Sequence, residues 1–370
     1  MAQTPVPLTL QHARFPKQLL QCSSPTRNRL RYVPILGFKP QPVIDQSSEM
    51  TPYPLTFSPV LKQTIWGGRR LGDHLKKPLG PASDYAESWE VVDHGEDQSV
   101  VQNGPLFGKT LKELIQSDAS WLLGNKTDID SFPLLLKYLD CNRVLSVQVH
   151  PSDEYALHMP EPDLGKTEAW YIVASDPESL IYAGLKPGVD SHGLQQAIEN
   201  GTTETVLHSF HPSAGDVLFI PAGTVHALGA GLLVAEIQQS SDTTFRLFDW
   251  NRTDLQGKSR PLHIAQGVEV TDFSSGPVSA RTSNPNHEGW QTVVSCDKFV
   301  LNLLEKGEAD IGGDEKFHIV TIPKGKATLR LGEEIMPLST GDTILLPAAI
   351  GNCRVLAAED STVMEMHLPA

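Results

Sequence analysis

The sequence predicts a mainly β protein built as two β-barrels of the same kind, with a short helical insertion. Three observations support this. Short strand-like runs recur along the chain between Gly, Pro, Asp and Asn residues. Helical periodicity is confined to a few short stretches. One pattern occurs twice, as GDVLFIPAGTVH at residues 215–226 and GDTILLPAAIGN at residues 341–352, and such a repeat indicates a duplicated architecture.

The predicted strands are short, apolar or alternating segments bounded by turn residues. They are residues 88–92, 132–139, 144–150, 169–173, 217–220, 232–238, 244–249, 299–304, 318–322, 326–330, 343–346 and 362–367. The predicted helices have apolar residues at helical spacing. They are residues 109–123, 192–199 and 262–268.

Composition divides the 370 residues into four segments. Residues 1–49 hold seven prolines, six basic and two acidic residues. We expect them to be a disordered tail or a gene-model extension, with translation starting near Met50, and a targeting segment is the alternative. Residues 50–273 are expected to form a larger first domain with a small helical insertion. Residues 274–288, rich in Ser, Pro, Asn and Gly, are expected to link it to a smaller β domain at residues 289–370.

The charge distribution excludes several classes of partner. The formal net charge is −14, but residues 1–49 carry +4, which leaves −18 on the remainder. Nucleic acids and anionic membrane surfaces bind clustered Lys and Arg, so neither is an expected partner. No apolar run reaches the roughly 20 residues of a membrane helix. Four widely spaced cysteines without a CxxC pair predict a reducing, cytoplasmic location.

Four side chains are candidates for a metal centre. Gln148 and His150 lie two residues apart on a predicted strand and therefore point to the same face. Two polar groups on an inward face are costly unless something coordinates them. Glu168 and His226 follow on later strands. Two imidazoles, one carboxylate and one amide oxygen suit Zn²⁺, with positions left open for water or substrate.

Several motifs carry a family resemblance. The first repeat copy resembles the second cupin motif, whose His is usually a ligand. Further motifs are IWGG, AESWEV, PLLLKYLD, QVHPSDEYA and GKTEAWYI, at residues 65–68, 86–91, 133–140, 148–156 and 165–172. Together they resemble the type I mannose-6-phosphate isomerases of the cupin superfamily, in their shorter bacterial form, over residues 52–368.

This resemblance implies a fold and a cofactor. The fold is two cupin-type, jelly-roll-like barrels, of which residues 50–273 form the catalytic zinc domain. The domain at residues 289–370 is expected to lack metal ligands, because Asn352 stands where the first copy has His226. Gln148, His150, Glu168 and His226 are the implied ligands of one Zn²⁺ per chain.

The resemblance also implies an activity, the interconversion of mannose 6-phosphate and fructose 6-phosphate through a cis-enediol. Arg246 is the implied catalytic arginine, ten residues after Glu236. Ser146 and Lys166 match positions proposed to hold the sugar phosphate, and Lys137 is a further pocket candidate.

Among these residues, Arg246 is too basic to accept a proton at neutral pH, so we expect it to stabilise the enediolate or to gate the sugar. Glu236 or a metal-bound water is the better candidate for moving the proton, and the choice stays open. Lys166 and His158 are further catalytic candidates.

An anionic substrate makes an electrostatic prediction. A chain this acidic needs a local positive patch, which the metal, Lys166, Arg246 and either Lys137 or Arg143 would supply. Acidic residues are expected to lie mainly on the surface away from the mouth of the pocket. Asp and Glu side chains lining that mouth would count against a sugar phosphate.

Two alternatives belong to other functional classes. One is another metal-dependent cupin enzyme, a dioxygenase or a different sugar isomerase; such enzymes more often use three His ligands with Fe or Mn, and Gln148 stands where the first His would be. The other is a sugar-binding regulatory cupin without metal. The sequence leaves open whether the protein is a monomer or a homodimer, its physiological direction and its side substrates.

Overall fold

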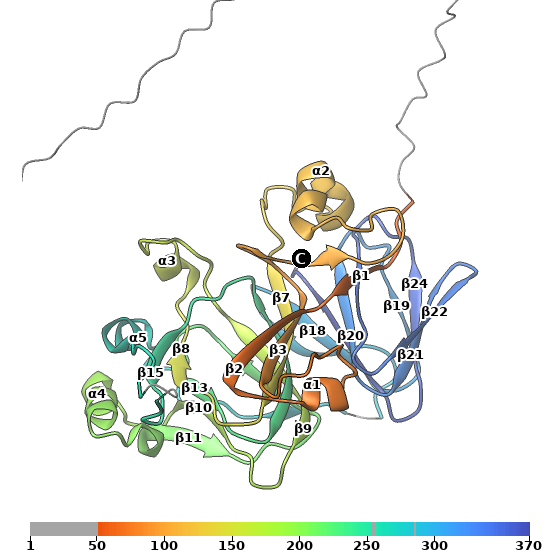
Figure 1. The fold of residues 1–370 in the computed structure, drawn as a ribbon. Coiled ribbons are helices and arrows are strands. Elements are labelled where there is room, and N and C mark those ends of the chain that lie inside the picture. Colours follow the sequence, from red (N-terminus) through yellow and green to blue (C-terminus); the bar gives the residue numbers. More distant parts are fainter. Residues whose placement is uncertain (1–50, 254–256, 285) are drawn as a thin grey trace, which may run out of the picture. The chain divides into compact units, whose positions relative to one another are not determined.

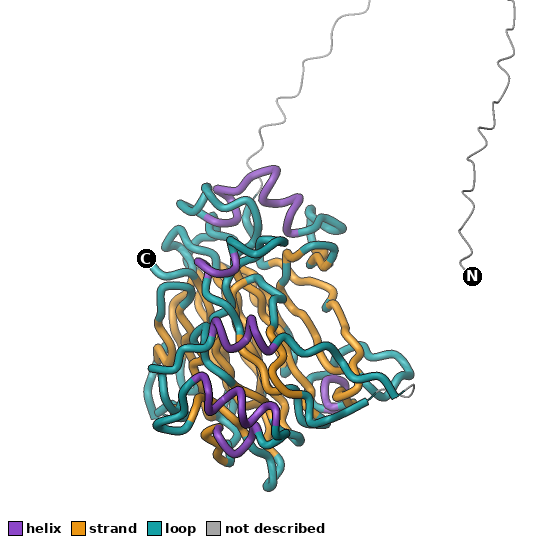
Figure 2. The backbone as a smooth tube through the Cα atoms, turned by 90° about the vertical axis from the view of Figure 1, so that its left-hand side faces the viewer, coloured by secondary structure: helices purple, strands orange, loops and turns teal. Residues whose placement is uncertain are grey.

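The computed structural model describes residues 51–253, 257–284 and 286–370. The predicted N-terminal tail at residues 1–49 lies outside this range. The described part of the chain is mainly β, as predicted, and its helices are short (Figures 1 and 2). None of its helices has the length and apolar character needed to cross a bilayer.

Two sheets hold the first repeat copy. Sheet I has the order β16-β12-β9-β14-β7-β3-β2 and sheet II the order β11-β10-β13-β8-β15. Sheet I consists of β2 (Val60–Gly68), β3 (Tyr85–Val91), β7 (Leu134–Cys141), β9 (Glu168–Ser175), β12 (Asp216–Ile220), β14 (Leu232–Gln239) and β16 (Arg281–Thr282). Sheet II consists of β8 (Val147–Val149), β10 (Ile181–Leu185), β11 (Leu207–Phe210), β13 (His226–Leu228) and β15 (Phe245–Phe248).

Two further sheets hold the second copy. Sheet III has the order β17-β18-β25-β20-β23-β1-β6 and sheet IV the order β19-β24-β21-β22. Sheet III consists of β1 (Leu55–Ser58), β6 (Val100–Val101), β17 (Gln291–Ser295), β18 (Val300–Leu304), β20 (His318–Lys324), β23 (Thr343–Leu346) and β25 (Thr362–His367). Sheet IV consists of β19 (Glu308–Ile311), β21 (Lys326–Leu331), β22 (Glu334–Ser339) and β24 (Cys353–Ala357). A small ribbon pairs β4 (Asp93–His94) with β5 (Asp97–Gln98).

Apolar side chains fill the space between the sheets of each pair. One buried cluster joins Trp170 and Leu218 of sheet I to Leu228 of sheet II. A second cluster joins Val320 of sheet III to Val355 of sheet IV. Helices cover the other face of sheet II. Val147 and Val149 of β8 pack against these helices, whereas Gln148 between them points inward, toward sheet I.

The helices of the described residues include the three predicted ones, with different ends, and two short helices that were not predicted. They are α1 (Arg70–Asp73), α2 (Leu111–Leu123), α3 (Asp153–Ala156), α4 (Ser191–Glu199), α5 (Ile264–Val270) and a 3₁₀ turn at Thr203–Val206. The predicted helix at residues 109–123 starts two residues late, because Thr110 and Glu113 form a capping box. Asp118 has extended φ and ψ and kinks this helix.

The two repeat copies share their local structure. Gly215 and Gly341 both have φ near +90°, a conformation that favours glycine. The carboxylates of Asp216 and Asp342 each accept a hydrogen bond of 2.8 Å from the backbone N–H three residues earlier. Each copy supplies one strand to the larger sheet, ends it before Pro, and continues into the smaller sheet. The duplicated local architecture predicted from these two segments is therefore present.

Strand β1 belongs to residues 50–273, the predicted first domain, but it joins a sheet of the second repeat copy. It is the N-terminal strand of the described residues, yet it pairs with β23 of sheet III, with Leu55 opposite Leu345 (Figure 1). The predicted linker at residues 274–288 contains β16, which pairs with β12. The domain boundaries at residues 273 and 289 stay predictions.

A buried charged network lies on the inner face of sheet III. Glu365 accepts hydrogen bonds from Nδ1 of His318 at 2.7 Å and of His367 at 2.9 Å. The other ring nitrogen of His318 contacts Asp314 at 2.9 Å. Burial opposes the charged form of His318, but the hydrogen bonds and charges of Glu365 and Asp314 outweigh it and raise the pKa of His318. Burial likewise opposes the ionised form of Glu365, yet its two His partners lower the pKa of Glu365 to about 2.

This network predicts a pH dependence of stability. Because the pKa of His318 is raised in the folded state, protonated His318 stabilises the fold fully below about pH 6.5. This stabilisation is lost as the pH rises through the folded-state pKa. Because the pKa of Glu365 is lowered, ionised Glu365 stabilises the fold above about pH 4.3. This stabilisation is lost as the pH falls towards 2. We expect urea unfolding to show the wild type losing stability from pH 6.5 to 9 and His318→Gln losing less, with the exposed His287→Gln as control. Parallel curves for the wild type and His318→Gln would contradict this assignment.

Candidate active site

Strand register places three predicted residues side by side on sheet II. Gln148 on β8 pairs with His226 on β13 and, on its other side, with Arg246 on β15. Directly paired residues point to the same face of a sheet. All three therefore face sheet I, where Glu168 begins β9. His150 follows β8 by one residue and joins them.

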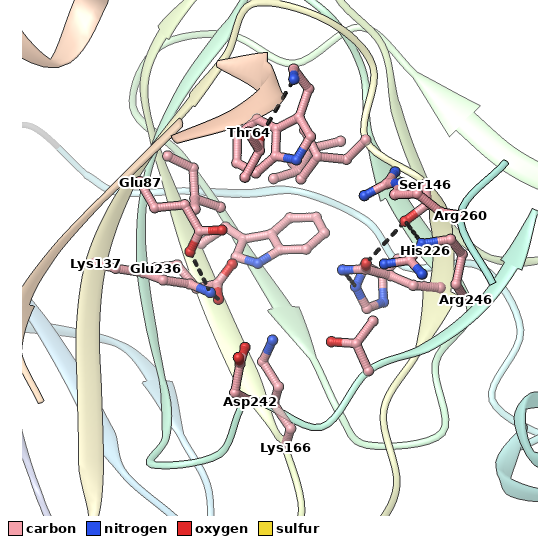
Figure 3. A pocket seen from close by; sticks show the side chains of 17 residues that line it. Thr64, Glu87, Lys137, Ser146, Lys166, His226, Glu236, Asp242, Arg246 and Arg260 are labelled. Atoms are coloured by element: carbon pink, nitrogen blue, oxygen red, sulfur yellow. Dashed lines mark hydrogen bonds and ion pairs between the residues drawn. The ribbon is translucent and has the colours of Figure 1, made fainter. Parts of the chain in front are cut away.

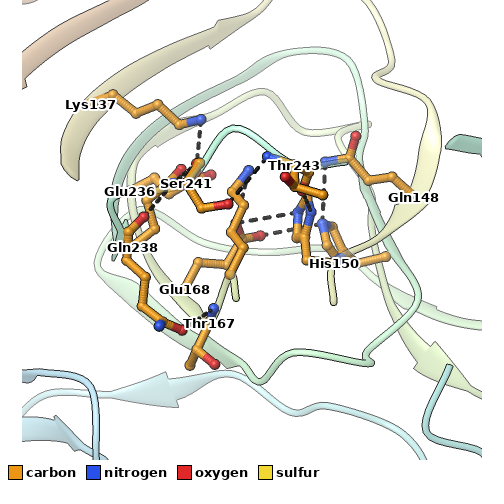
Figure 4. A network of polar contacts seen from close by, with 12 residues as sticks. Lys137, Gln148, His150, Thr167, Glu168, Glu236, Gln238, Ser241 and Thr243 are labelled. Atoms are coloured by element: carbon orange, nitrogen blue, oxygen red, sulfur yellow. Dashed lines mark hydrogen bonds and ion pairs between the residues drawn. The ribbon is translucent and has the colours of Figure 1, made fainter. Parts of the chain in front are cut away.

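The candidate metal ligands converge in the interior (Figure 4). His226 Nε2 lies 3.3 Å from Glu168 Oε1, and His150 Nε2 lies 3.5 Å from Glu168 Oε2. All three side chains are buried. Gln148 Nε2 lies 3.3 Å from His226 Nε2, and a half-turn of the amide would place Oε1 there instead.

Hydrogen bonds leave the ring nitrogens ready for a cation. Nδ1 of His150 donates to the carbonyl oxygen of Thr243 at 3.0 Å, and Nδ1 of His226 donates to that of Thr224 at 2.9 Å. The lone pair of each imidazole therefore lies on Nε2. Burial lowers the pKa of His150 well below its ordinary value and that of His226 to about 4, so both rings are neutral, the form that binds metals.

The same residues have the chemistry and the spacing to bind a divalent metal. His150 Nε2 and both carboxylate oxygens of Glu168 are buried without a hydrogen-bond partner. Such atoms are costly unless something binds them. Zinc ligands about 2.1 Å from a tetrahedral centre lie about 3.4 Å apart, which matches the spacing of these atoms.

A second group of possible ligands does not show these features. His318, Glu365 and His367 also bring ligand atoms within 4.8 Å of one another. Their facing atoms are already joined by hydrogen bonds of 2.7 and 2.9 Å. In the part of the chain that the structure describes, the unpartnered ligand atoms are thus those of the first group.

A buried ion pair lies beside the candidate metal centre. Lys137 on β7 pairs in register with Glu236 on β14, and its Nζ lies 3.0 Å from Glu236 and 3.5 Å from Glu87. Burial would lower the pKa of Lys137, but the two carboxylates outweigh burial and raise it. Burial would raise the pKa of Glu236, but Lys137 outweighs burial and lowers it. Lys137 is thus a buried cation paired with two carboxylates.

The other predicted cations lie near the same space. Lys166 is buried, with Nζ 3.6 Å from Glu168 Oε2. Arg246 donates from Nε to Ser146 Oγ at 3.3 Å and from Nη1 to the carbonyl oxygen of Pro261 at 3.0 Å. The carboxylate of Asp249, three residues after Arg246, binds Arg252 and Arg260.

One cavity of about 330 Å³ collects most of these side chains (Figure 3). This volume suits a small-molecule ligand. Predicted residues that line it are Lys137, Ser146, Gln148, Lys166, His226, Glu236 and Arg246. Glu168 and His150 lie deeper, and Glu168 contacts both His226 and Lys166.

Two further candidates lie elsewhere. His158 is exposed and lines a different cavity next to α3. Arg143 is exposed and is not among the residues that line the 330 Å³ cavity.

The cavity also has members that sequence reasoning missed. They are Thr64, Trp66, Glu87, Asp242 and Arg260. Trp66 and Glu87 lie inside the motifs IWGG and AESWEV, which could have identified them. No sequence signal marks Asp242 or Arg260, because only the fold brings their loops to the cavity.

The cavity lining includes three acidic residues, although acidic residues were expected to lie mainly elsewhere. Glu87, Glu236 and Asp242 all line the cavity. Net charge did not predict this because Lys137 pairs with two of the three. Figure 3 shows Glu87, Lys137 and Glu236 on one side and Ser146, Arg246 and Arg260 on the other. The cavity therefore has an acidic and a basic side.

Comparisons with known proteins agree on one family. Residues 55–177 match the family described as phosphomannose isomerase type I, catalytic domain. The chain is 37% identical over 309 residues to mannose-6-phosphate isomerase ManA of Bacillus subtilis, covering 83% of this chain and 96% of that relative.

Solved structures point the same way. The crystal structure of mannose 6-phosphate isomerase from Bacillus subtilis has a TM-score of 0.75 at 32% identity, covering 85% of this chain and 99% of that one. A structure of mannose 6-phosphate isomerase bound with zinc and yttrium has a TM-score of 0.69 at 15% identity, covering 86% of this chain and 100% of that one, a likeness of fold alone.

Proposed function

Because the chain belongs to the type I phosphomannose isomerase family, we propose that it interconverts mannose 6-phosphate and fructose 6-phosphate in the cavity between sheets I and II. It is an aldose–ketose isomerase. The observation that supports this location is the group of unpartnered, buried ligand atoms on His150 and Glu168, next to a cavity lined by both acidic and basic side chains.

We propose one zinc ion per chain as the metal. His150, Glu168 and His226 would hold it, with the amide oxygen of Gln148 as a further ligand. When bound, the metal stabilises the negative charge that develops on the sugar oxygens, as a Lewis acid. The deep position of the ligands excludes water and strengthens electrostatic interactions with the substrate.

Glu236 is the proposed acid–base group. Lys137 holds it ionised at neutral pH, so it can accept the proton from C2 of the aldose and return it to C1. Such a positioned group contributes about 10²–10⁴-fold to the rate. Arg246 is proposed to stabilise the enediolate, because its guanidinium carries a permanent positive charge.

Ser146, Lys166 and Lys137 are proposed to bind the substrate. Ser146 accepts a hydrogen bond from Arg246 and donates a long one of 3.4 Å to Gln148 Oε1, so its hydroxyl lies at the cavity between these two side chains. Lys166 lies between Glu168 and the cavity and can donate to a sugar oxygen. A monomeric or homodimeric state and a cytoplasmic location stay predictions.

A coupled assay tests the function. We expect the purified protein to form fructose 6-phosphate from mannose 6-phosphate, to lose this activity with a chelator, and to regain it with zinc. Metal analysis should find one zinc per chain; iron would favour an oxygenase, and no metal a sugar-binding module. Absence of turnover in the zinc-loaded protein would overturn the proposal.

A further inference from the structure

Two arginines bind one carboxylate on the basic side of the cavity, and a third arginine lies nearby. Arg260 binds Asp249 through Nε at 2.8 Å and Nη2 at 2.5 Å. Arg252 binds the same carboxylate and also donates to the carbonyl oxygen of Val144 at 2.6 Å. Arg246 lies close enough to be influenced by Asp249, Arg252 and Arg260. Within the described part of this group, one carboxylate is therefore accompanied by two arginines that bind it and a third nearby.

The positive charges of this group repel one another, which disfavours the charged form of Arg246. Burial, then the charge of Arg260, lowers the pKa of Arg246, and Arg252 adds to the effect. Asp249 is the acidic residue that opposes it. A group of like charges beside a cavity is stabilised when an anion binds among them. The geometry thus provides a site for an anion.

The arginines differ in where they face. Arg246 and Arg260 line the cavity together with Ser146, whereas Arg252 is not among the lining residues (Figure 3). Asp249 engages one edge of the Arg260 guanidinium. Since a guanidinium has five N–H donors, three are not used by this pair. A guanidinium held by one edge is oriented for two-point contact with phosphate at the other.

The acidic side sets the direction of the substrate. The three carboxylates there (Glu87, Glu236 and Asp242) outnumber the two lysines of the cavity, Lys137 and Lys166, and disfavour a phosphate dianion placed among them. A sugar phosphate therefore enters with its phosphate toward Arg260 and its C1–C2 end toward Glu236 and the metal ligands. The acidic lining is compatible with such a substrate because the two charges occupy different sides.

We propose that Arg260 binds the substrate phosphate and selects phosphorylated over free sugars, and that Asp249 is the positioning residue that orients it. The proposal rests on the proposed function for the identity of the substrate.

Replacing Arg260 with glutamine tests this inference. Charge-assisted hydrogen bonds contribute about 1.5–3 kcal/mol, so KM for mannose 6-phosphate should rise about 10–100-fold, with kcat within about 3-fold of the wild type. The inhibition constant of inorganic phosphate should rise by a similar factor. The inhibition constant of unphosphorylated mannose should not change.

Two further variants separate binding from folding. Arg260→Lys keeps the charge beside Asp249 but not the planar fork, so we expect a smaller rise in KM, about 5-fold. Asp249→Asn should raise KM without a matching fall in kcat, because Arg260 loses its orientation. The exposed Arg354→Gln, whose partners are Glu308 and Asp310, is the matched control and should leave all constants unchanged.

The outcomes are distinguishable. If the wild type turns over mannose 6-phosphate and folded Arg260→Gln keeps the wild-type KM and phosphate inhibition, the inference about Arg260 is wrong while the function stands. If the wild type shows no turnover, the function is wrong. If Arg260→Gln does not fold, Arg260→Lys decides, and an unchanged KM there rejects the role of Arg260.

Discussion

His226→Ala is expected to remove the metal and the isomerase activity together while leaving the fold in place. His226 lies at the centre of the ligand group, next to Gln148 in sheet II and 3.3 Å from Glu168. Without its imidazole, the metal site loses a ligand, and His150, Glu168 and Gln148 remain. Losing several kcal/mol of charge stabilisation corresponds to a fall in kcat of about 10³-fold or more.

The cost to stability of this change should be modest. The His226 ring packs against Trp170 at 5.3 Å and His150 at 4.9 Å between centroids, so the alanine variant leaves a small cavity. Compared as metal-free proteins, wild type and variant should differ by about 2 kcal/mol in unfolding free energy. The half-buried His208→Ala, on β11 outside the cavity, should keep metal and activity. Full activity or a normal metal content in His226→Ala would show that the ligand set is wrong.

Lys137→Met should cause the largest loss of stability among single changes at the site. It removes the cation between Glu236 and Glu87 and leaves the Glu236 charge buried without its partner. Breaking a buried pair in this way costs about 3–5 kcal/mol. We expect urea unfolding to show this loss and kcat to fall as well, because Glu236 no longer has the cation that keeps it ionised.

Two controls identify the cause. The double variant Lys137→Met/Glu236→Gln should recover much of the stability, because the uncompensated charge is gone, but not the activity. The partly exposed Lys62, which pairs with Asp97 at 2.5 Å, is the matched surface lysine, and Lys62→Met should cost about 1 kcal/mol or less. Equal losses from the Lys137 and Lys62 changes would contradict a special role for the buried pair.

Local signals predicted the strands and the repeat well. Each predicted strand segment overlaps a strand of the structure, since short β-branched runs between turn residues carry their own signal. The shared turns at Gly215 and Gly341 could be read directly from the two GD motifs. The inward direction of Gln148 followed from strand alternation alone.

Features that depend on pairing between distant segments could not be predicted this way. Arg260 carries no recognisable motif, and its place in the cavity depends on its hydrogen bonds to Asp249. The acidic side of the cavity was missed because net charge does not show that Lys137 lies between Glu87 and Glu236. Strand β1 was missed because its partner is far away in the sequence.

The pairing of β1 with β23 has a consequence for how the protein is made. Leu55 emerges from the ribosome long before Leu345, its partner 290 residues later. At about 5–20 residues per second, β1 waits about 15–60 s for that partner. Of its two partner strands among the described residues, the short β6 is the one already made during this time. The nascent chain therefore carries an unfinished sheet edge until translation is almost complete, and a chain that terminates early keeps that edge exposed to other polypeptides.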